Sequence, residues 1–504
     1  MQVATEQPDL HLPVELWSYI FLHLDLASLR NSALTCSRFR WLARRYMYAR
    51  LTIICEYSWE AFLYVFKTSQ RRGLTNALER LRFVASPDIA PLIRTCSVQF
   101  QTWPDPPFEP VLNIVCDHLH LLVNLQQLEF HNILLTPSRV SDMSTLLSLK
   151  HLILKECSLQ PGSISSKIST KSLTISRDSH ASYDPVDPPR WLALIDPDKL
   201  LSLNLITSRA TLEGLSELTS TDISLPRLQS LHLNRDRKIM HCPAFSAVLK
   251  RCPSLLHLYI REPEPEKSPE GAILLDDLPC SLHGLVLYDG PHFLLSSFYE
   301  EQLRGLRRVR LFGDRWDRTC DMIGIRDDLW HLHRGAPELE SMHLRAFHTS
   351  EMCTMIANLF PMLQSLAFSL PTQTSAEDPM MALTREVRLH RSPIVNSLFL
   401  SFFPYIQPFL ESLISMTLPS NLKNLVVFGM IFSDATEGGQ VIEVLSGRYP
   451  SLQRIFLYFP QGFWMAWSNA ETRAATESCH ISDTEVIPKG ITTCRQLDVP
   501  PRWF

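Results

Sequence analysis

Apolar and polar residues follow a recurring pattern along most of the chain, in the order apolar-x-x-apolar-x-apolar, where x is most often polar. The last two apolar positions of each copy are separated by one residue, as one buried face of a short strand requires. The pattern therefore predicts a series of short strands. The copies are Ile93/Cys96/Val98, Leu125/Leu128/Phe130, Leu149/Leu152/Leu154, Leu200/Leu203/Leu205, Leu228/Leu231/Leu233, Leu255/Leu258/Ile260, Leu282/Leu285/Leu287, Leu306/Val309/Leu311, Leu339/Met342/Leu344, Leu363/Leu366/Phe368, Val395/Leu398/Leu400, Leu422/Leu425/Val427 and Leu452/Ile455/Leu457, with a weaker copy at Leu173/Ile175.

Apolar runs with helical spacing lie between the predicted strands, such as Phe245/Val248/Leu249 and Met352/Met355/Ile356/Leu359. Strands and helices that alternate in one constant order build a parallel sheet with helices outside it. We therefore expect an α/β fold in which residues 91–468 form a solenoid with a parallel inner sheet and outer helices. Successive copies begin about 28 residues apart on average, which is a period of leucine-rich repeats.

The repeat is irregular. Leucine-rich repeats carry an Asn or Cys shortly after the third apolar position. In this chain that place is clear only at Cys157, whereas other copies have Ser208, Asp236, Pro263, Gly290 or Asp314 there. We therefore expect an irregular leucine-rich-repeat solenoid without a continuous asparagine ladder.

The first 51 residues show a different pattern, which predicts three short amphipathic helices. Pro13 suits the first helical position, and Leu16, Ile20 and Leu24 repeat every four residues, with Trp17 and Phe21 widening the apolar stripe. Asp25 and Ser37 are candidate caps of the second and third helices. The apolar positions of these two helices are Leu26, Leu29, Ala33 and Cys36, and then Phe39, Leu42, Ala43 and Tyr46. A unit of this size buries little surface, so it is expected to lean on a neighbour or a partner.

The run Leu12-Pro13-x-Glu15-x4-Ile20-x3-Leu24, followed by Leu29, Leu34, Cys36, Phe39, Leu42 and Ala43, resembles an F-box. The chain is similar to fungal and animal F-box proteins that carry divergent leucine-rich repeats. The resemblance implies docking on the Skp-type adaptor of a cullin–RING ubiquitin ligase. It also implies that the matching positions contact the adaptor or support the docking surface: Leu12, Pro13, Leu16, Ile20, Leu24, Leu34 and Leu42. Phe39-Arg40-Trp41 departs mildly from the family, and an ordinary N-terminal helical cap remains the alternative.

These patterns divide the chain into an F-box at 8–51, a helical connector at 52–90, the solenoid at 91–468 and a mobile or loosely packed tail at 469–504. Proline-rich loops are expected at 103–107, 184–189 and 261–269. The apolar stretch from Val395 to Met416 contains prolines and a glutamate, so a strand followed by a buried helix fits it better than a membrane span.

Composition narrows the class of partner. A formal net charge of −4 gives no case for general binding to nucleic acid or to anionic membranes. The 12 cysteines are scattered in mostly apolar context, as expected in a reducing compartment, and no basic region opens a secretory signal. We therefore expect a cytoplasmic and/or nuclear protein. The basic run at Arg38, Arg40, Arg44, Arg45 and Arg50 fits a solvated or partner-facing helix side better than a nucleic-acid patch.

The sequence holds no catalytic signature for nucleophilic hydrolases, P-loop proteins, dinucleotide-binding proteins or zinc proteases. Asp327 and His331 are spaced to share a helix face and bind a metal, but no third ligand is evident, so a partly exposed helix between repeats is the favoured interpretation. No catalytic residue, metal or cofactor is therefore expected.

The x positions of the repeats point away from the predicted core and line the inner face of the sheet. The substrate-binding candidates on this face are His232, His257, Tyr259, Arg308, Arg310 and His343. Arginine pairs with carboxylates and phosphates in two-pronged fashion, and tyrosine supplies contact area at low entropic cost. Arg308 and Arg310 are the expected ionic part, with His257 and Tyr259 beside them beyond one intervening strand. An ordinary solvated sheet face is the alternative.

Together these observations favour a non-catalytic substrate-recognition subunit of an SCF-type ubiquitin ligase. The expected partners are the Skp-type adaptor, through it the cullin and RING subunits, and an unidentified substrate protein held by the repeats. An interaction scaffold that binds the adaptor without delivering substrates remains open, as does, more remotely, an enzyme with a site hidden in the loops.

Overall fold

A computed structural model describes residues 12–55, 79, 81–100, 109–160, 166–177, 190–221, 223–234, 243–261, 284–312, 322–345, 350–369, 417–428, 435–458, 463–469 and 491–495 of the 504-residue chain. The chain divides into two compact units, Met1–Ser254 and Leu255–Phe504. Each unit is described by itself.

The first unit begins with helices α1 (Val14–Leu22), α2 (Leu26–Thr35) and α3 (Ser37–Met47), as the amphipathic pattern predicts. The side chain of Asp25 caps α2 by accepting a hydrogen bond from Ser28 N at 2.7 Å. The cap of α3 is Cys36, whose Sγ accepts from Phe39 N, and not the expected Ser37. Pro13 directly precedes α1. Each helix thus starts within one residue of its predicted cap.

The three helices close around a small core of their own. Phe21, Leu29, Leu42 and Ala43 are buried at its centre. The ring of Phe39 packs against Trp17, with 4.6 Å between ring centroids, and the Tyr46 hydroxyl donates to Ser18 O at 2.7 Å. These contacts fix α3 against α1. The core is complete without any residue from the outer face of α1.

A parallel sheet follows in the first unit, with strand order β1-β2-β3-β5-β7-β8-β9. Its strands are β1 (Arg50–Cys55), β2 (Thr95–Phe100), β3 (Gln127–His131), β5 (His151–Lys155), β7 (Ser172–Ser176), β8 (Ser202–Leu205) and β9 (Ser230–Asn234). The short strands β4 (Leu134–Leu135) and β6 (Ser158–Leu159) pair separately. The predicted apolar positions on β2, β3, β5, β7, β8 and β9 are buried.

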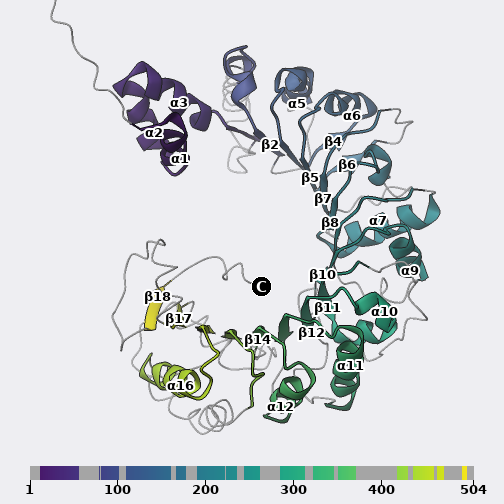
Figure 1. Cartoon of the computed structure of the whole chain (residues 1–504). Coiled ribbons are helices and arrows are strands. Elements are labelled where there is room, and N and C mark those ends of the chain that lie inside the picture. Colours follow the sequence, from purple (N-terminus) through teal and green to yellow (C-terminus); the bar gives the residue numbers. More distant parts are fainter. Residues whose placement is uncertain are drawn as a thin grey trace, which may run out of the picture. The chain divides into compact units, whose positions relative to one another are not determined.

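Helical segments connect the strands of the first unit: η2 (Ala90–Leu92), α5 (Glu109–His118), η4 (Leu119–Leu121), α6 (Pro137–Ser144), η5 (Leu192–Leu194), α7 (Ser208–Ser220) and α9 (Pro243–Lys250). Figure 1 shows α5, α6, α7 and α9 on one side of this unit's strands. The opposite face of the sheet carries the x positions of the repeats and has no such helix layer among the described residues.

The start of the expected helical connector is wrong, because residues 50–55 form strand β1, in parallel register with β2. Leu51 and Ile53 alternate with exposed Thr52 and Ile54, which is the pattern of a half-buried strand. The sheet therefore begins directly after the third helix. Most of the remaining connector, residues 56–78, lies outside the described residues.

The second unit contains parallel strands in the order β10 to β16, followed by two antiparallel strands. The strands are β10 (His257–Arg261), β11 (Leu287–Pro291), β12 (Arg308–Phe312), β13 (Ser341–Arg345), β14 (Ser365–Ser369), β15 (Asn424–Phe428), β16 (Arg454–Tyr458), β17 (Phe463–Ser468) and β18 (Ile491–Arg495). Its helices are η6 (His292–Ser297), α10 (Glu300–Leu303), α11 (Met322–Gly335), α12 (Ser350–Leu359) and α16 (Ala435–Arg448).

Strand β11 lies in a different register from the predicted one. Tyr288, not Leu285, is opposite Leu258 of β10 and Val309 of β12. Tyr288 is fully buried, and its hydroxyl donates to Pro291 O at 2.7 Å. The true copy of the repeat is therefore Leu285/Tyr288/Gly290, three residues later than Leu282/Leu285/Leu287. The small Gly290 occupies the third apolar position beside the Tyr288 ring.

The predicted tail also differs from the structure. Residues 491–495 form β18, which pairs antiparallel with β17. β17 itself pairs antiparallel with β16, so the parallel order ends at β16. The other stretches for which a structure was predicted, 103–107, 184–189, 262–269 and 395–416, lie outside the described residues. Among the helices that are described, none is long and apolar enough to cross a membrane.

Side-chain hydrogen bonds that join the ends of neighbouring strands differ from repeat to repeat. Cys157 Sγ donates to Phe130 O at 3.4 Å. Two asparagines outside the expected place do the same work: Asn132 Nδ2 donates to Phe100 O and Asn234 Nδ2 to Ile206 O. The described part of the chain thus joins neighbouring strand ends with different residue types rather than with one asparagine ladder.

Candidate functional site

A stripe of exposed apolar side chains lies on α1 and on the two residues that precede it. It is made of Leu12, Pro13, Leu16 and Ile20, which are all exposed, with half of the Leu16 side-chain surface open to solvent. Residues three and four apart share one helix face, so Leu16 and Ile20 are neighbours on it. We call these four residues the α1 stripe. Leu34 on α2 is also exposed, at 78%.

Two of the seven adaptor-binding candidates belong to the core instead. Leu42 is completely buried in the centre of the three-helix core, and Leu24 packs against that core half-buried. Neither offers much surface to a partner. The structure therefore separates the candidates into exposed positions, namely the α1 stripe and Leu34, and the supporting positions Leu24 and Leu42.

Sequence reasoning missed Trp41 as a surface residue. Its side chain is 56% exposed, and the guanidinium of Arg45 lies over its ring at 5.1 Å from the ring centroid. This cation–π pair covers part of α3. The basic run is exposed at Arg38, Arg40, Arg45 and Arg50, whereas Arg44 is half-buried. Trp41 directly precedes the core residues Leu42 and Ala43 on α3. Adjacent residues of a helix do not share one face, so this position was the available signal that Trp41 lies outside the core.

In the second unit the candidates of β10, β12 and β13 lie in rows across the sheet. One row joins Tyr259, Asp289, Arg310 and His343, and the row beside it joins His257, Leu287 and Arg308. Asp289, which the misread register hid, stands between the tyrosine and the arginine. Arg310 Nη1 lies 3.8 Å from Asp289 Oδ2. Asp289 therefore offsets part of the positive charge expected on this face.

Burial and neighbouring charge change the titration of two residues on this face. Burial, with a smaller effect of the Arg308 charge, lowers the pKa of His257 below its usual value. Burial and the nearby Asp289 carboxylate raise the pKa of Tyr259. Both shifts favour the neutral side chain. Of the two arginines on β12, only Arg310 has a carboxylate partner among the described residues.

The remaining two candidates are less accessible or lie elsewhere. His343 is buried, with 5% of its surface exposed, so its ring is largely covered by neighbours. His232 belongs to β9 of the first unit, where its Nε2 is 3.0 Å from Ser230 Oγ. The structure brings together Tyr259, Arg310 and His343 by register, but it does not make one exposed surface of all six.

The metal hypothesis for Asp327 and His331 has no support in the geometry. His331 Nε2 is 2.7 Å from Phe298 O, and Asp327 is exposed. The neighbouring Asp328 pairs instead with His292, at 2.5 Å between Oδ2 and Nδ1. No group of three or more His, Cys, Asp or Glu side chains suited to a metal occurs among the described residues.

Buried cysteines serve as small apolar residues. Cys96, Cys116, Cys157, Cys252 and Cys353 are buried in the described core. Burial raises the pKa of each of these thiols to about 12. At neutral pH they are protonated and therefore weak nucleophiles.

Comparison with known proteins identifies the first part of the chain. A family model described as F-box-like matches residues 9–54. No curated protein matches the chain. Among solved structures, a crystal structure of a Bacteroides fragilis protein matches with 13% identity over 65% of this chain and 75% of that chain, at a TM-score of 0.30, which is too low to carry an argument. Residues 9–54 are therefore an F-box-like domain, followed by a mostly parallel repeat-like sheet with helices.

Proposed function

We propose that this protein is a substrate-recognition subunit of an SCF-type cullin–RING ubiquitin ligase. In this proposal the F-box-like domain binds a Skp-type adaptor, and the repeats, which we assign as divergent leucine-rich repeats, bind the protein to be ubiquitinated. F-box domains in general bind such adaptors, which supports a role in F-box-mediated protein interaction.

The α1 stripe is the observation that carries the proposal. Its leucines and isoleucine are exposed although the core of the three helices is already closed. An exposed contiguous apolar surface on a small domain is typical of a protein–protein interface. Full burial of a leucine side chain in a partner contributes roughly 1.5–3 kcal/mol. Leu12, Leu16 and Ile20 are 40%, 50% and 39% exposed, so covering each of them in a partner contributes about half of that value.

Leu24 and Leu42 have an indirect part in adaptor binding. Leu42 is buried beside Phe21 and Leu29, so its removal would open a cavity beneath α1. The stripe would then lose its fixed geometry. Leu34, at the far end of α2, extends the apolar surface beyond α1 in the proposed interface.

The chain contributes proximity rather than chemistry in this proposal. F-box family proteins are in general non-catalytic adaptors. Holding a substrate lysine near a ubiquitin-conjugating enzyme converts an encounter between free partners into a reaction within one complex. Cullin and RING subunits are reached only through the adaptor, and we place the protein in the cytoplasm and/or nucleus.

Affinity capture tests the proposal. The tagged full chain should co-precipitate the adaptor together with cullin, whereas the Leu12→Ala/Pro13→Ala double variant should lose both and keep its repeat-bound proteins. Reconstituted ubiquitin transfer to a captured protein would support the receptor role. Adaptor capture without any such transfer would favour the scaffold, and undiminished adaptor capture by the double variant would remove the ligase proposal.

A further inference from the structure

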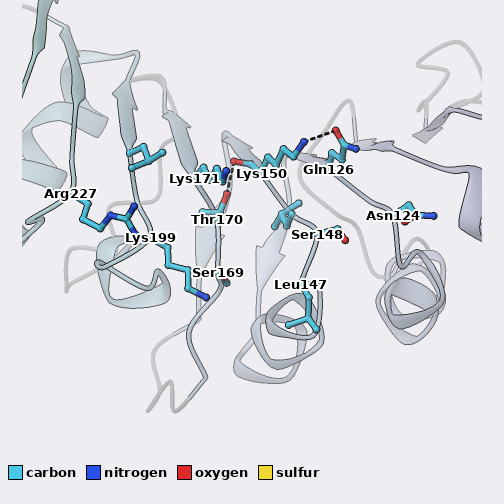
Figure 2. Close-up of a pocket in the computed structure, with 12 residues that line it drawn as sticks. Asn124, Gln126, Leu147, Ser148, Lys150, Ser169, Thr170, Lys171, Lys199 and Arg227 are labelled. Atoms are coloured by element: carbon cyan, nitrogen blue, oxygen red, sulfur yellow. Dashed lines mark hydrogen bonds between the residues drawn. The ribbon is translucent and has the colours of Figure 1, made fainter. Parts of the chain in front are cut away.

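A hollow lined by basic side chains lies at the beginning of the strands in the first unit. It has a volume of about 420 Å³ and is lined by the segments that precede β3, β5, β7, β8 and β9. Figure 2 shows Lys150, Lys171, Lys199 and Arg227 following one another across these segments. We call this cavity, with its four cations, the basic hollow. Among the described residues, no Asp or Glu side chain lines it.

The regular register of the sheet brings these cations together. Lys150 directly precedes β5 and Lys171 directly precedes β7. The first residues of these adjacent strands, His151 and Ser172, are opposite each other, so the two lysines are neighbours. Lys199 and Arg227 stand three residues before Ser202 and Ser230, which are also opposite each other. Neighbouring strands are about 4.8 Å apart. Residues 21 to 77 positions apart in sequence thus converge on one edge.

The backbone of this edge is already occupied, so its side chains must do the recognition. Lys150 N donates to Gln126 O at 2.8 Å, and Lys171 N to Lys150 O at 3.1 Å. Lys150 O also accepts from Thr170 Oγ1. The only side-chain interactions of the four cations among the described residues are Lys150 Nζ to Gln126 Oε1 and Arg227 Nη1 to the backbone carbonyl of Asp198.

The corresponding edge of the second unit is mixed. Lys423, directly before β15, donates to Gln364 Oε1 at 3.4 Å, much as Lys150 donates to Gln126, whereas another cation has carboxylate partners. There Arg307, which stands directly before β12, forms ion pairs with Glu338 and Glu340. In the basic hollow the cations have no carboxylate partner and repel one another across one strand spacing. An anionic ligand would relieve that repulsion.

An exposed leucine beside the basic hollow points to a protein ligand. Leu147 lines the same hollow and is 88% exposed, more than any other large apolar side chain in the described part of the chain. Figure 2 shows it at the side of the hollow near Ser148 and Ser169. No aromatic side chain of the described part of the chain lines the hollow, so its known lining offers single-stranded nucleic acid no stacking platform.

We propose that the basic hollow binds an acidic segment of a partner protein, in which carboxylate or phosphate groups meet Lys150, Lys171, Lys199 and Arg227 and an apolar side chain covers Leu147. The span from β3 to β9 crosses four strand spacings, roughly 19 Å, which an extended segment of about six residues covers. The binding is independent of the F-box-like domain and does not require an adaptor.

Fluorescence anisotropy with the full chain tests the site. The probe is a labelled eight-residue peptide with a central leucine flanked by glutamates, compared with counterparts carrying phosphoserine or glutamine in place of glutamate. We expect the two anionic peptides to bind and the glutamine peptide to bind at least about tenfold more weakly. Raising the salt concentration should weaken the binding of the two anionic peptides but not that of the glutamine peptide. The ratio of the dissociation constants of the glutamate and phosphoserine peptides shows whether the site prefers carboxylate or phosphate.

The Lys150→Glu/Lys171→Glu double variant should lose anionic-peptide binding by more than about tenfold. Arg82→Glu/Lys250→Glu changes the net charge equally, at exposed cations that do not line the hollow, and should bind like the parent. A milder Lys150→Gln/Lys171→Gln variant, checked by circular dichroism, separates lost binding from lost folding. Leu147→Ala should weaken the leucine peptide several-fold without changing its salt dependence.

Three results would overturn the proposal. The first is no anionic-peptide binding at about millimolar concentration, the weakest affinity of interest. The second is binding that survives both lysine variants. The third is a single-stranded oligonucleotide that binds the same lysines more tightly than either anionic peptide, which would assign the hollow to nucleic acid.

Discussion

Asp289 faces Arg310 on the neighbouring strand, with 3.8 Å between the carboxylate Oδ2 and the guanidinium Nη1. Arg308 lies two residues before Arg310 on the same strand. It has no such carboxylate partner among the described residues and is exposed. The two arginines of β12 are therefore not equivalent. Arg310 is partly neutralised within the protein, and Arg308 is the stronger attraction for an acidic partner.

This difference gives a prediction for the inner face of the second unit. Replacing both Arg308 and Arg310 by Glu should lose the captured substrate but keep the adaptor, and Arg308→Glu alone should account for most of the loss. Quantitative comparison of captured proteins checks this. If Arg310→Glu alone has the larger effect, the pairing with Asp289 does not reduce the attraction of Arg310 for the substrate. Equal capture by the double variant and the parent would place the substrate elsewhere.

Glu217 gives a prediction about pH. Burial raises the pKa of this carboxyl from 4.5 to about 7, although its oxygens accept hydrogen bonds from Leu192 N and Ala193 N. The folded state therefore binds more protons than the unfolded state between pH 4.5 and 7, and the free energy of unfolding falls as pH rises through this window. The contribution is on the order of 3 kcal/mol. Above pH 7 the ionised group adds no further slope.

Denaturant unfolding of the parent and Glu217→Gln at pH 5 and pH 8 measures this slope. The difference in stability between the two pH values should be smaller in Glu217→Gln, because the amide does not titrate. Glu443→Gln, at an exposed position of α16, is the control and should leave the slope unchanged. Parallel pH profiles for parent and Glu217→Gln would show that the carboxyl titrates alike in both states.

Arg177 and Glu213 give a prediction about stability. Arg177 is buried, and its Nη1 donates to both oxygens of Glu213 at 2.7 and 2.9 Å. Removing one partner of a buried pair leaves an uncompensated charge and typically costs about 3–5 kcal/mol. Glu213→Gln should therefore lower the free energy of unfolding strongly. Glu129→Gln, which breaks the more exposed pair with Lys155, should cost about 1 kcal/mol or less; equal losses would contradict the assigned burial.

Tyr288 tests the register of β11. Its buried hydroxyl donates to Pro291 O, so Tyr288→Phe should cost about 1 kcal/mol, the usual net value of one such hydrogen bond. Tyr288→Ala should cost about 3–5 kcal/mol because it leaves a cavity. Chemical denaturation measures both losses. A Tyr288→Ala variant as stable as the parent would return the strand to the register with Leu285 at that position.

The sequence predicted the elements whose apolar positions are leucine, isoleucine, valine or phenylalanine at regular spacing. It misplaced β11 because Leu282, Leu285 and Leu287 look like a repeat, whereas the true positions are Leu285, Tyr288 and Gly290. A search for large aliphatic residues does not find Tyr288, which is buried because its hydroxyl has a partner inside the protein, or Gly290, which has no side chain. The same error hid Asp289 and made the face look more basic than it is.

The basic hollow was also beyond prediction from the sequence. Its cations stand in the turns before four different strands, and nothing in the local sequence of each turn marks it. Their meeting depends on the register between strands, which the structure supplies. The α1 stripe, in contrast, was predictable because its residues lie close together in sequence, on α1 and directly before it, although the pattern could not tell exposed Leu16 from buried Leu42.

Adaptor affinity of two matched α1 variants tests the central claim most directly. Leu16 and Leu22 are both exposed leucines of one helix, about a third of a turn apart around its axis. Titration calorimetry of the purified chain with a Skp-type adaptor should show that Leu16→Asp weakens binding by about 2 kcal/mol or more, as expected for an interface anchor. Leu22→Asp should bind like the parent. Equal binding by the parent and Leu16→Asp would contradict the assignment of the α1 stripe as the adaptor-binding surface.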